Sequence, residues 1–177
     1  MLARLLIEHD HILKTLSLLE KQFLDLCRGG TPDYSLMRSI IVYIQEYPEQ
    51  VHRPLEDMIF SILLERVDEI KLIQELITEH TELEIETRKL RESLELLKSG
   101  IVSKEELKKQ LSSFLVRQRQ HIYIEEVKVH PLIQSVLTKK DWNHVQSIVP
   151  ILDDPVFGER TRNDYELLYR EIEDKSK

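Results

Sequence analysis

The 177-residue chain has few of the residues that interrupt helices or cross-link a fold. It contains only four glycines and six prolines, while leucine, glutamate, isoleucine and lysine are abundant. Few turn formers and many helix formers predict an all-α protein. Its one cysteine, Cys27, excludes an internal disulfide and fits a reducing cytosol. We therefore expect a cytoplasmic location.

Long apolar runs and an excess of positive charge are also absent. The sequence has no run of about 18 apolar residues that could span a membrane, and residues 1–10 hold too short an apolar run for a signal peptide. The net charge of −7 argues against nucleic acid or an anionic membrane as a partner. A chain of this length with 41% hydrophobic residues suits one domain with a sizeable core.

Apolar residues recur in steps of three and four along four long segments, which is typical of helices in a bundle. The predicted helices span about residues 2–27, 35–66, 68–98 and 103–139. Pro48 and Pro54 lie inside the second segment, so we expect a kink or a break there. Short connections between long amphipathic helices predict an up-down-up-down four-helix bundle over residues 1–139.

The remaining residues, 140–177, predict a short helical extension that packs on or near the bundle. We expect a short helix near 142–148, an Asp-Asp-Pro turn, and a charged helix over about 159–174. The extension offers a surface for a homodimer or for a protein partner.

One histidine on each long helix takes a position that would otherwise hold an apolar residue. These histidines are His9, His52, His80 and His121. Counted from the connections between successive helices, neighbouring histidines differ in height by about 3 Å or less at a rise of about 1.5 Å per residue. The spacing therefore predicts that the four side chains meet at one level. His11, His130 and His144 fail this count, and His130 is expected about 13 Å beyond His121.

Two of the four histidines are followed by a glutamate one helical turn later. The pairs are His52 with Glu56 and His121 with Glu125. A helix places residues i and i+4 on one face, so each pair presents an imidazole beside a carboxylate. Glu84 follows His80 at the same spacing and is either a ligand or a helix-surface residue. Glu126 is the rival of Glu125, and both Glu84 and Glu126 stay less certain ligands.

Imidazole and carboxylate without thiolate suit iron, manganese or zinc. A closed zinc site needs only four ligands, so six or more candidates at one level indicate two metal ions. Two bridging carboxylates and four imidazoles fill roughly eight of the twelve positions around two octahedral ions. A bridging oxide or hydroxide could take two more, and a small molecule such as dioxygen could bind at the open ones. The ferritin-like alternative needs Glu-x-x-His on two helices, and only Glu49 and His52 have that spacing.

These motifs resemble the hemerythrin-like family, also called the HHE cation-binding domain, in its bacterial form. The resemblance spans residues 1–158 and is carried by Glu8-His9, the run from Tyr47 to Asp57, Glu79-His80, the run from His121 to Glu126, Pro131, and the closing run from Asp153 to Gly158. It implies a non-haem centre of two iron ions, oxo- or hydroxo-bridged, in which the two glutamates also bridge. The ligands it implies are His9, His52, Glu56, His80, His121 and Glu125.

The chain departs from the oxygen-carrying members of this family at two positions. Those members have a second histidine one turn after the helix-3 ligand, where this chain has Glu84. His130 stands before the helix-4 proline, where the residue is often apolar and aromatic. Both departures argue against reversible dioxygen carriage.

Three functions are compatible with this pattern. The first is a di-iron protein that binds or senses dioxygen or a related small molecule, such as nitric oxide or peroxide. The second is a di-iron oxidoreductase that reduces peroxide or oxidises a substrate, although the sequence locates neither a substrate pocket nor a proton donor. The third is a metal-free helical interaction module.

Overall fold

The computed structural model describes residues 1–149, 152–159 and 161–173, and it shows no strand within these ranges. The helices are α1 (Leu2–Cys27), α2 (Tyr34–Glu46), α3 (Arg53–Leu64), α4 (Ile70–Leu97), α5 (Lys104–Ile124), α6 (His130–Val136), α7 (Lys139–Ile148) and α8 (Glu166–Glu173). Two π-helical segments, η1 (Pro48–His52) and η2 (Glu125–Val129), and a 3-10 turn, η3 (Asn163–Tyr165), complete the secondary structure.

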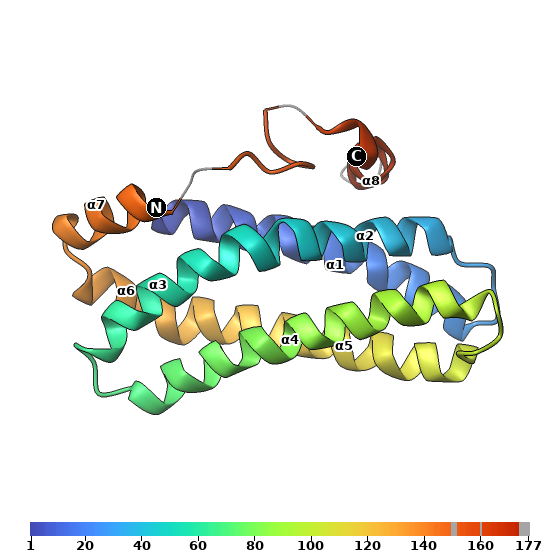
Figure 1. Cartoon of the computed structure of the whole chain (residues 1–177), viewed down its shortest axis with the longest axis horizontal. Helices are drawn as coiled ribbons and strands as arrows, with labels where there is room; N and C mark the ends of the chain where they lie inside the picture. The colour runs from blue at the N-terminus through green and yellow to red at the C-terminus, as the bar shows by residue number, and fades with distance from the viewer. Residues whose placement is uncertain (150–151, 160, 174–177) are drawn as a thin grey trace.

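Four antiparallel columns of helix form the bundle (Figure 1). The columns are α1, then α2–η1–α3, then α4, then α5–η2–α6. The column of α4 packs against α5 and α2, and α1 packs against α5. The predicted all-α, up-down-up-down four-helix bundle is confirmed, together with the break at Pro48.

Local sequence explains where the columns turn. The Asp33 side chain accepts a hydrogen bond of 2.9 Å from the backbone N–H of Leu36 and so caps α2. Ser103 caps α5 in the same way, with 3.1 Å to the N–H of Glu106. Gly100, after α4, has a φ of +72°, a conformation that residues with a Cβ rarely adopt.

The last column differs from the prediction of one helix over 103–139. The backbone changes to the π pattern over η2 and ends as a helix at Val136. Pro131 explains the change, because proline has no N–H for the α-helical ladder and its ring clashes with the carbonyl four residues earlier. Thr138 then begins α7 with a capping box to Asp141.

Buried apolar side chains form two clusters, and on each column the boundary between them falls near a predicted site histidine. On α1, Leu5 belongs to one cluster and Ile12 to the other. On α4, Leu76 and Leu90 are divided in the same way. A polar level therefore crosses the bundle between two apolar walls, and both walls shield it from water.

The last helix of the C-terminal extension, α8, packs against α1 and α2 (Figure 1). This helix is shorter than the expected 159–174, because η3 and α8 begin only at Asn163. Residues 160 and 174, at which part of this expectation falls, lie outside the described residues. The helix expected near 142–148 is α7, which packs against α3. The division into domains at residue 139 stays a prediction.

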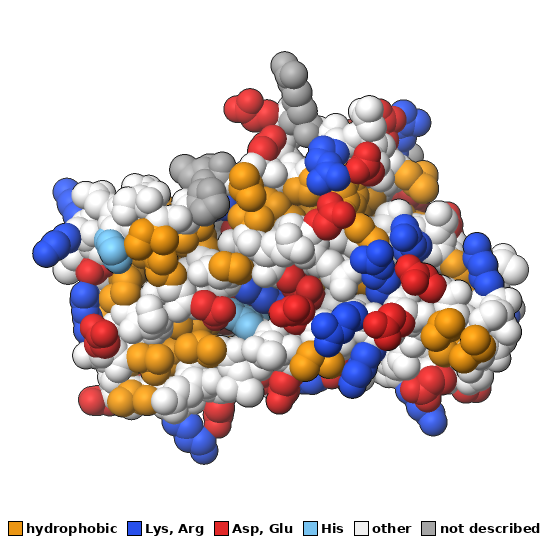
Figure 2. Space-filling view, viewed as in Figure 1, with side chains coloured by type: hydrophobic (Ala, Val, Ile, Leu, Met, Phe, Trp, Pro, Cys, Tyr) orange, Lys and Arg blue, Asp and Glu red, His pale blue; other side chains and the backbone are white. Residues whose placement is uncertain are grey.

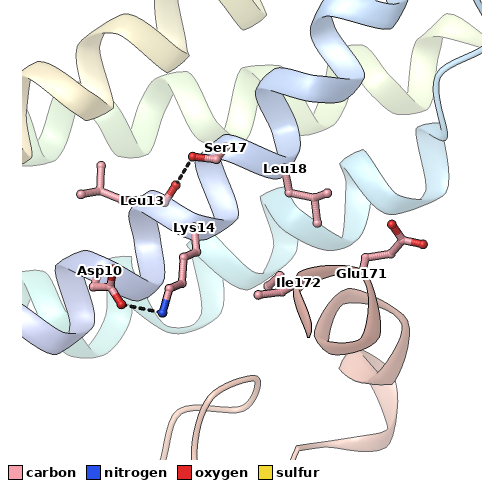
Figure 3. Close-up of a pocket in the computed structure, with 7 residues that line it drawn as sticks. All are labelled: Asp10, Leu13, Lys14, Ser17, Leu18, Glu171 and Ile172. Atoms are coloured by element: carbon pink, nitrogen blue, oxygen red, sulfur yellow. Dashed lines mark hydrogen bonds and ion pairs between the residues drawn. The ribbon is translucent and has the colours of Figure 1, made fainter. Parts of the chain in front are cut away.

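A groove of about 360 Å³ separates α8 from α1 (Figure 3). Asp10 is an exposed residue, and its carboxylate forms an ion pair of 2.7 Å with Lys14 along this groove. On the face shown in Figure 2, acidic and basic side chains are interspersed. No helix in the described part of the chain is both long and apolar enough to cross a membrane.

Asp154 anchors the extension to the bundle. Its carboxylate accepts hydrogen bonds from the Tyr43 hydroxyl at 2.9 Å and from the backbone N–H groups of Val156 and Phe157 at 2.8 and 3.0 Å. The Phe157 ring stacks on His11, with 4.0 Å between the ring centroids. The Asp-Asp-Pro turn therefore makes specific side-chain contacts with α1 and α2.

Asp154→Ala should lower the free energy of unfolding by about 2 kcal/mol or more. The substitution leaves the fully buried Tyr43 hydroxyl without its acceptor, and an unsatisfied buried polar group costs ~1–3 kcal/mol. Chemical denaturation followed by circular dichroism measures the change. Asp153→Ala, at the exposed neighbour, is the control with a smaller expected effect, and equal losses for the two variants would contradict this anchor.

Candidate metal centre

Six side chains from the four columns meet at the polar level, and none is more than 5% exposed. They are His9 on α1, His52 in η1, Glu56 on α3, His80 on α4, His121 on α5 and Glu125 in η2. These are the six residues that the sequence predicted. Helical spacing turns each of them inward, and the equal heights bring them together.

Glu56 reaches three of the four histidines. Its Oε1 lies 3.3 Å from Nε2 of His9 and 3.2 Å from Nε2 of His52. Its Oε2 lies 3.5 Å from Nε2 of His80. The carboxylate therefore extends between histidines of different columns.

Glu125 does the same from the opposite column. Its Oε1 lies 3.1 Å from Nε2 of His121 and 3.4 Å from Nε2 of His80, and its Oε2 lies 3.4 Å from Nε2 of His9. Each of the two carboxylates thus contacts histidines of both pairs, which is the arrangement that bridging ligands need.

The two halves of the centre are related by an approximate two-fold axis. The rings of His9 and His52 lie 4.9 Å apart with an interplanar angle of 62°, and those of His80 and His121 lie 4.8 Å apart at 67°. Each half contains two imidazoles and shares both carboxylates, so the site offers two similar sets of donors that could each hold a cation.

An outer carboxylate holds the second ring nitrogen of every histidine. The Nδ1 distances are 3.2 Å from His9 to Glu126, 2.7 Å from His52 to Glu8, 2.6 Å from His80 to Asp57 and 2.9 Å from His121 to Glu79. An Nδ1–H that donates to a carboxylate leaves the lone pair of Nε2 free for a metal and makes the imidazole a stronger ligand. All four histidines are therefore oriented for coordination.

The structure shows where Glu84 and Glu126, the two less certain ligand candidates, lie relative to the six meeting side chains. The Glu126 side chain is 36% exposed and contacts His9 from outside, so it is an orienting residue in this structure. Glu84 is exposed and is not among the residues that meet. Asp57 lies against His80, as an orienting carboxylate would.

The histidines and carboxylates shift each other's pKa values. Burial alone would lower the pKa of His9, but hydrogen bonds to Glu125 and Glu56 outweigh it and raise the pKa to about 10. Burial would also lower the pKa of His121, but the charge of Glu125 outweighs this effect and raises the pKa to about 9. Burial would raise the pKa of Glu125, yet His121 and its neighbours hold it well below its ordinary value. Without a cation, protons on the histidines balance the buried carboxylates.

The donor set fits metal ions. Buried polar atoms usually have a hydrogen-bond partner, whereas Nε2 of His121 lies 3.1 Å from Oε1 of Glu125 without the geometry of a hydrogen bond to any described residue. Two groups of three donors have atoms within 4.8 Å of one another: His80 with His121 and Glu125, and His9 with Glu56 and His130. These nitrogen and oxygen donors suit first-row divalent ions.

The predicted place of His130, about 13 Å beyond His121 and away from the site, was wrong. Its ring stacks on His9 with 5.3 Å between centroids. The π-helical segment η2 changes the face of the column on which His130 lies. Side chains also lean toward the N-terminus of their own helix, so the His130 side chain on α6 leans back toward the level of His9. Pro131 was the available signal, because a proline inside a helix marks an irregular turn.

Arg53 and Gln118 are two further residues that the sequence analysis missed. Both line a hollow of about 10 Å³ beside His52, His121 and the two inner glutamates. Nη2 of Arg53 donates to Oε1 of Gln118 at 3.3 Å. Nη1 of Arg53 lies 3.4 Å from Oε1 of Glu49 and forms an ion pair with it, while Nε2 of Gln118 has no hydrogen-bond partner in the described ranges. Gln118 could have been recognised, because it lies three residues before His121 on a seam that is otherwise apolar.

Comparison with known proteins agrees with this geometry. The family model described as hemerythrin HHE cation binding domain matches residues 1–133, a range that includes all six meeting residues. Comparisons with curated proteins and with solved structures gave no match. The chain therefore belongs to the hemerythrin HHE cation-binding family.

Proposed function

We propose that the protein holds two iron ions in a non-haem centre and uses them to bind or sense a small molecule such as dioxygen or nitric oxide. His9 and His52 would hold one ion, His80 and His121 the other, with both inner glutamates shared. The observation that carries the proposal is that each buried carboxylate contacts three Nε2 atoms drawn from both pairs.

The chain's own residues would hold, orient and isolate the ions. The outer carboxylates keep each Nε2 turned inward, and the two apolar clusters exclude bulk water from the level of the histidines. Iron in this donor set supplies redox chemistry and affinity for diatomic molecules. The protein supplies the ligand geometry and limits access.

The size of the free space supports a very small ligand. The hollow beside the inner ligands has about 10 Å³, and holding one water molecule takes roughly 10–15 Å³. The hollow is therefore about the size that one water molecule needs, so it favours a very small ligand, whereas an organic substrate would require the bundle to open.

Metal analysis tests the proposal. The purified chain is loaded with ferrous iron without oxygen, desalted and exposed to air; we expect two iron ions per chain, with new near-ultraviolet and visible absorption. His52→Ala should lower the stoichiometry, while His144→Ala, at an exposed histidine on α7, should retain two. Wild-type protein that stays metal-free would refute the proposal.

Peroxide breakdown is a second candidate function, and Arg53 with Gln118 favours it. The unpaired amide N–H of Gln118 and the guanidinium of Arg53 beside it can donate to the oxygens of a bound peroxide in a water-poor space, where such donors act strongly. Two molecules of hydrogen peroxide would give two of water and one of dioxygen, so no external reductant is needed. This step uses the redox capacity of bound iron.

Gln118→Leu and Arg53→Met should each lower the rate of peroxide breakdown by about tenfold or more, because losing one stabilising donor costs on the order of 10²–10³ in better-defined sites. Dioxygen release measured with an electrode gives the rate, and iron content should stay at two per chain. Wild-type protein that consumes no peroxide would remove this candidate without affecting iron binding.

A further inference from the structure

His130 is a buried histidine whose ring nitrogens are both unpaired. It is 5% exposed, and neither Nδ1 nor Nε2 has a hydrogen-bond partner in the part of the chain that the structure describes. Burying a polar group without a partner costs free energy. A histidine in this state therefore needs a ligand or another reason to be there.

Its surroundings offer donors for a shared cation. One atom each from His130, His9 and Glu56 lie within 4.8 Å of one another. Donors around one ion, with bonds of about 2 Å, lie up to about 4 Å apart. The His130 ring would have to rotate out of its stack on His9 to bring all three donors into one coordination sphere.

Packing alone does not explain the imidazole. The approximate two-fold axis relates His130 on His9 to Phe60 on His80. The Phe60 and His80 rings stack at 5.8 Å and 17°, and the His130 and His9 rings at 5.3 Å and 11°. A phenylalanine thus fills the equivalent space in the other half and brings no polar nitrogen into the interior.

We propose that His130 is a fifth histidine ligand and binds the metal ion held by His9 and His52. The inference rests on the proposed di-metal centre and makes its two positions unequal. One ion would have three imidazoles, while the ion at His80 and His121 would have two and keep more open coordination. A small molecule in the hollow beside His52 and His121 would then bind the ion held by His121.

His130→Phe tests the inference, because it copies the residue found at the related position. Zinc binding is measured by competition with a chromophoric chelator, with His144→Phe as the control at an exposed histidine. Wild-type and control should bind two zinc ions. His130→Phe should bind one of the two at least about tenfold more weakly, since even outer residues of metal sites are worth 10–100-fold. Unchanged affinities for both ions would overturn the proposal.

A measurement on the wild-type chain avoids any effect of the substitution on folding. Protein labelled with ¹⁵N in its seven histidines is titrated with zinc, and the ring nitrogen resonances are followed by NMR. Five rings should show the shift of a metal-bound nitrogen. Four shifted rings with two bound zinc ions would refute the role of His130 and leave the di-metal centre intact. No zinc binding at all would refute both.

Discussion

Glu56→Gln and Glu125→Gln should each abolish stable binding of both metal ions. Each carboxylate contacts histidines of both pairs, so in the proposed centre its loss would remove a ligand from two ions at once. We expect affinity to fall by more than about 100-fold, beyond the 10–100-fold typical of residues that only support a ligand. Competition titration with zinc and metal analysis after iron loading measure the effect.

The same substitutions should destabilise the metal-free protein at pH 6. Removing one carboxylate leaves buried, protonated histidines without their counter-charge, which costs ~3 kcal/mol, the lower end for a broken buried pair. The cost stays at the lower end because histidines can release protons. Denaturant unfolding with a chelator present gives the value.

Glu84→Gln is the matched control for both measurements. Glu84 follows His80 by one turn, as Glu56 follows His52, but its side chain is exposed. It should leave metal binding and stability unchanged. Equal loss of metal in Glu84→Gln and Glu56→Gln would contradict the ligand set proposed above.

The metal-free protein should become less stable as the pH rises from about 6.5 to 10. The pKa values of His9 and His121 are raised to about 10 and about 9, above the ordinary 6.5. Stability from a raised pKa is fully present below the ordinary value and is lost as the pH rises through the folded value.

At acid pH the opposite sign applies to Glu8. Burial would raise the pKa of Glu8, but His52, Arg4 and Tyr47 outweigh it and lower the pKa to about 2. The contribution of Glu8 to stability is therefore lost as the pH falls from 4.5 toward 2.

Bound metal should reverse the alkaline trend. A cation takes the place of the protons on the histidines, so binding releases protons and strengthens with pH. The difference in melting temperature between zinc-loaded and chelator-treated protein should therefore grow from pH 6 to pH 9. A metal-free melting temperature that is constant or rises over this range would contradict the assignment of protons to the cluster.

Much of the centre could be predicted from spacing because regular helices relate sequence to position simply. The rise per residue sets the level of His9, His52, His80 and His121, and the helical period sets the face that each presents. The same period places each inner glutamate beside the histidine one turn before it. These relations hold within a column. Short loops fix the height of one column relative to the next, so equal distances from a loop place residues of two columns at the same height.

The outer carboxylates could not be assigned from spacing, because their partners lie on other columns. Glu8 precedes His9 in the sequence but holds His52, and Glu79 precedes His80 but holds His121. Each of these carboxylates turns away from its own neighbour and meets the histidine of the adjacent column. Only packing between the columns decides such a pairing.

By itself, the sequence determined the helical class, the break at Pro48 and which six inner side chains meet. The break follows from the missing N–H of proline. The meeting of His9, His52, Glu56, His80, His121 and Glu125 follows from the period and rise of a regular helix. The tertiary structure decided the places of His130, Arg53 and Gln118. A π-helical turn before Pro131 changes the face on which His130 lies, and the donors of Arg53 and Gln118 acquire a shared hollow only when three columns pack together. Irregular backbone and contacts between distant segments have no fixed spacing along the chain, so no periodic pattern could have predicted them.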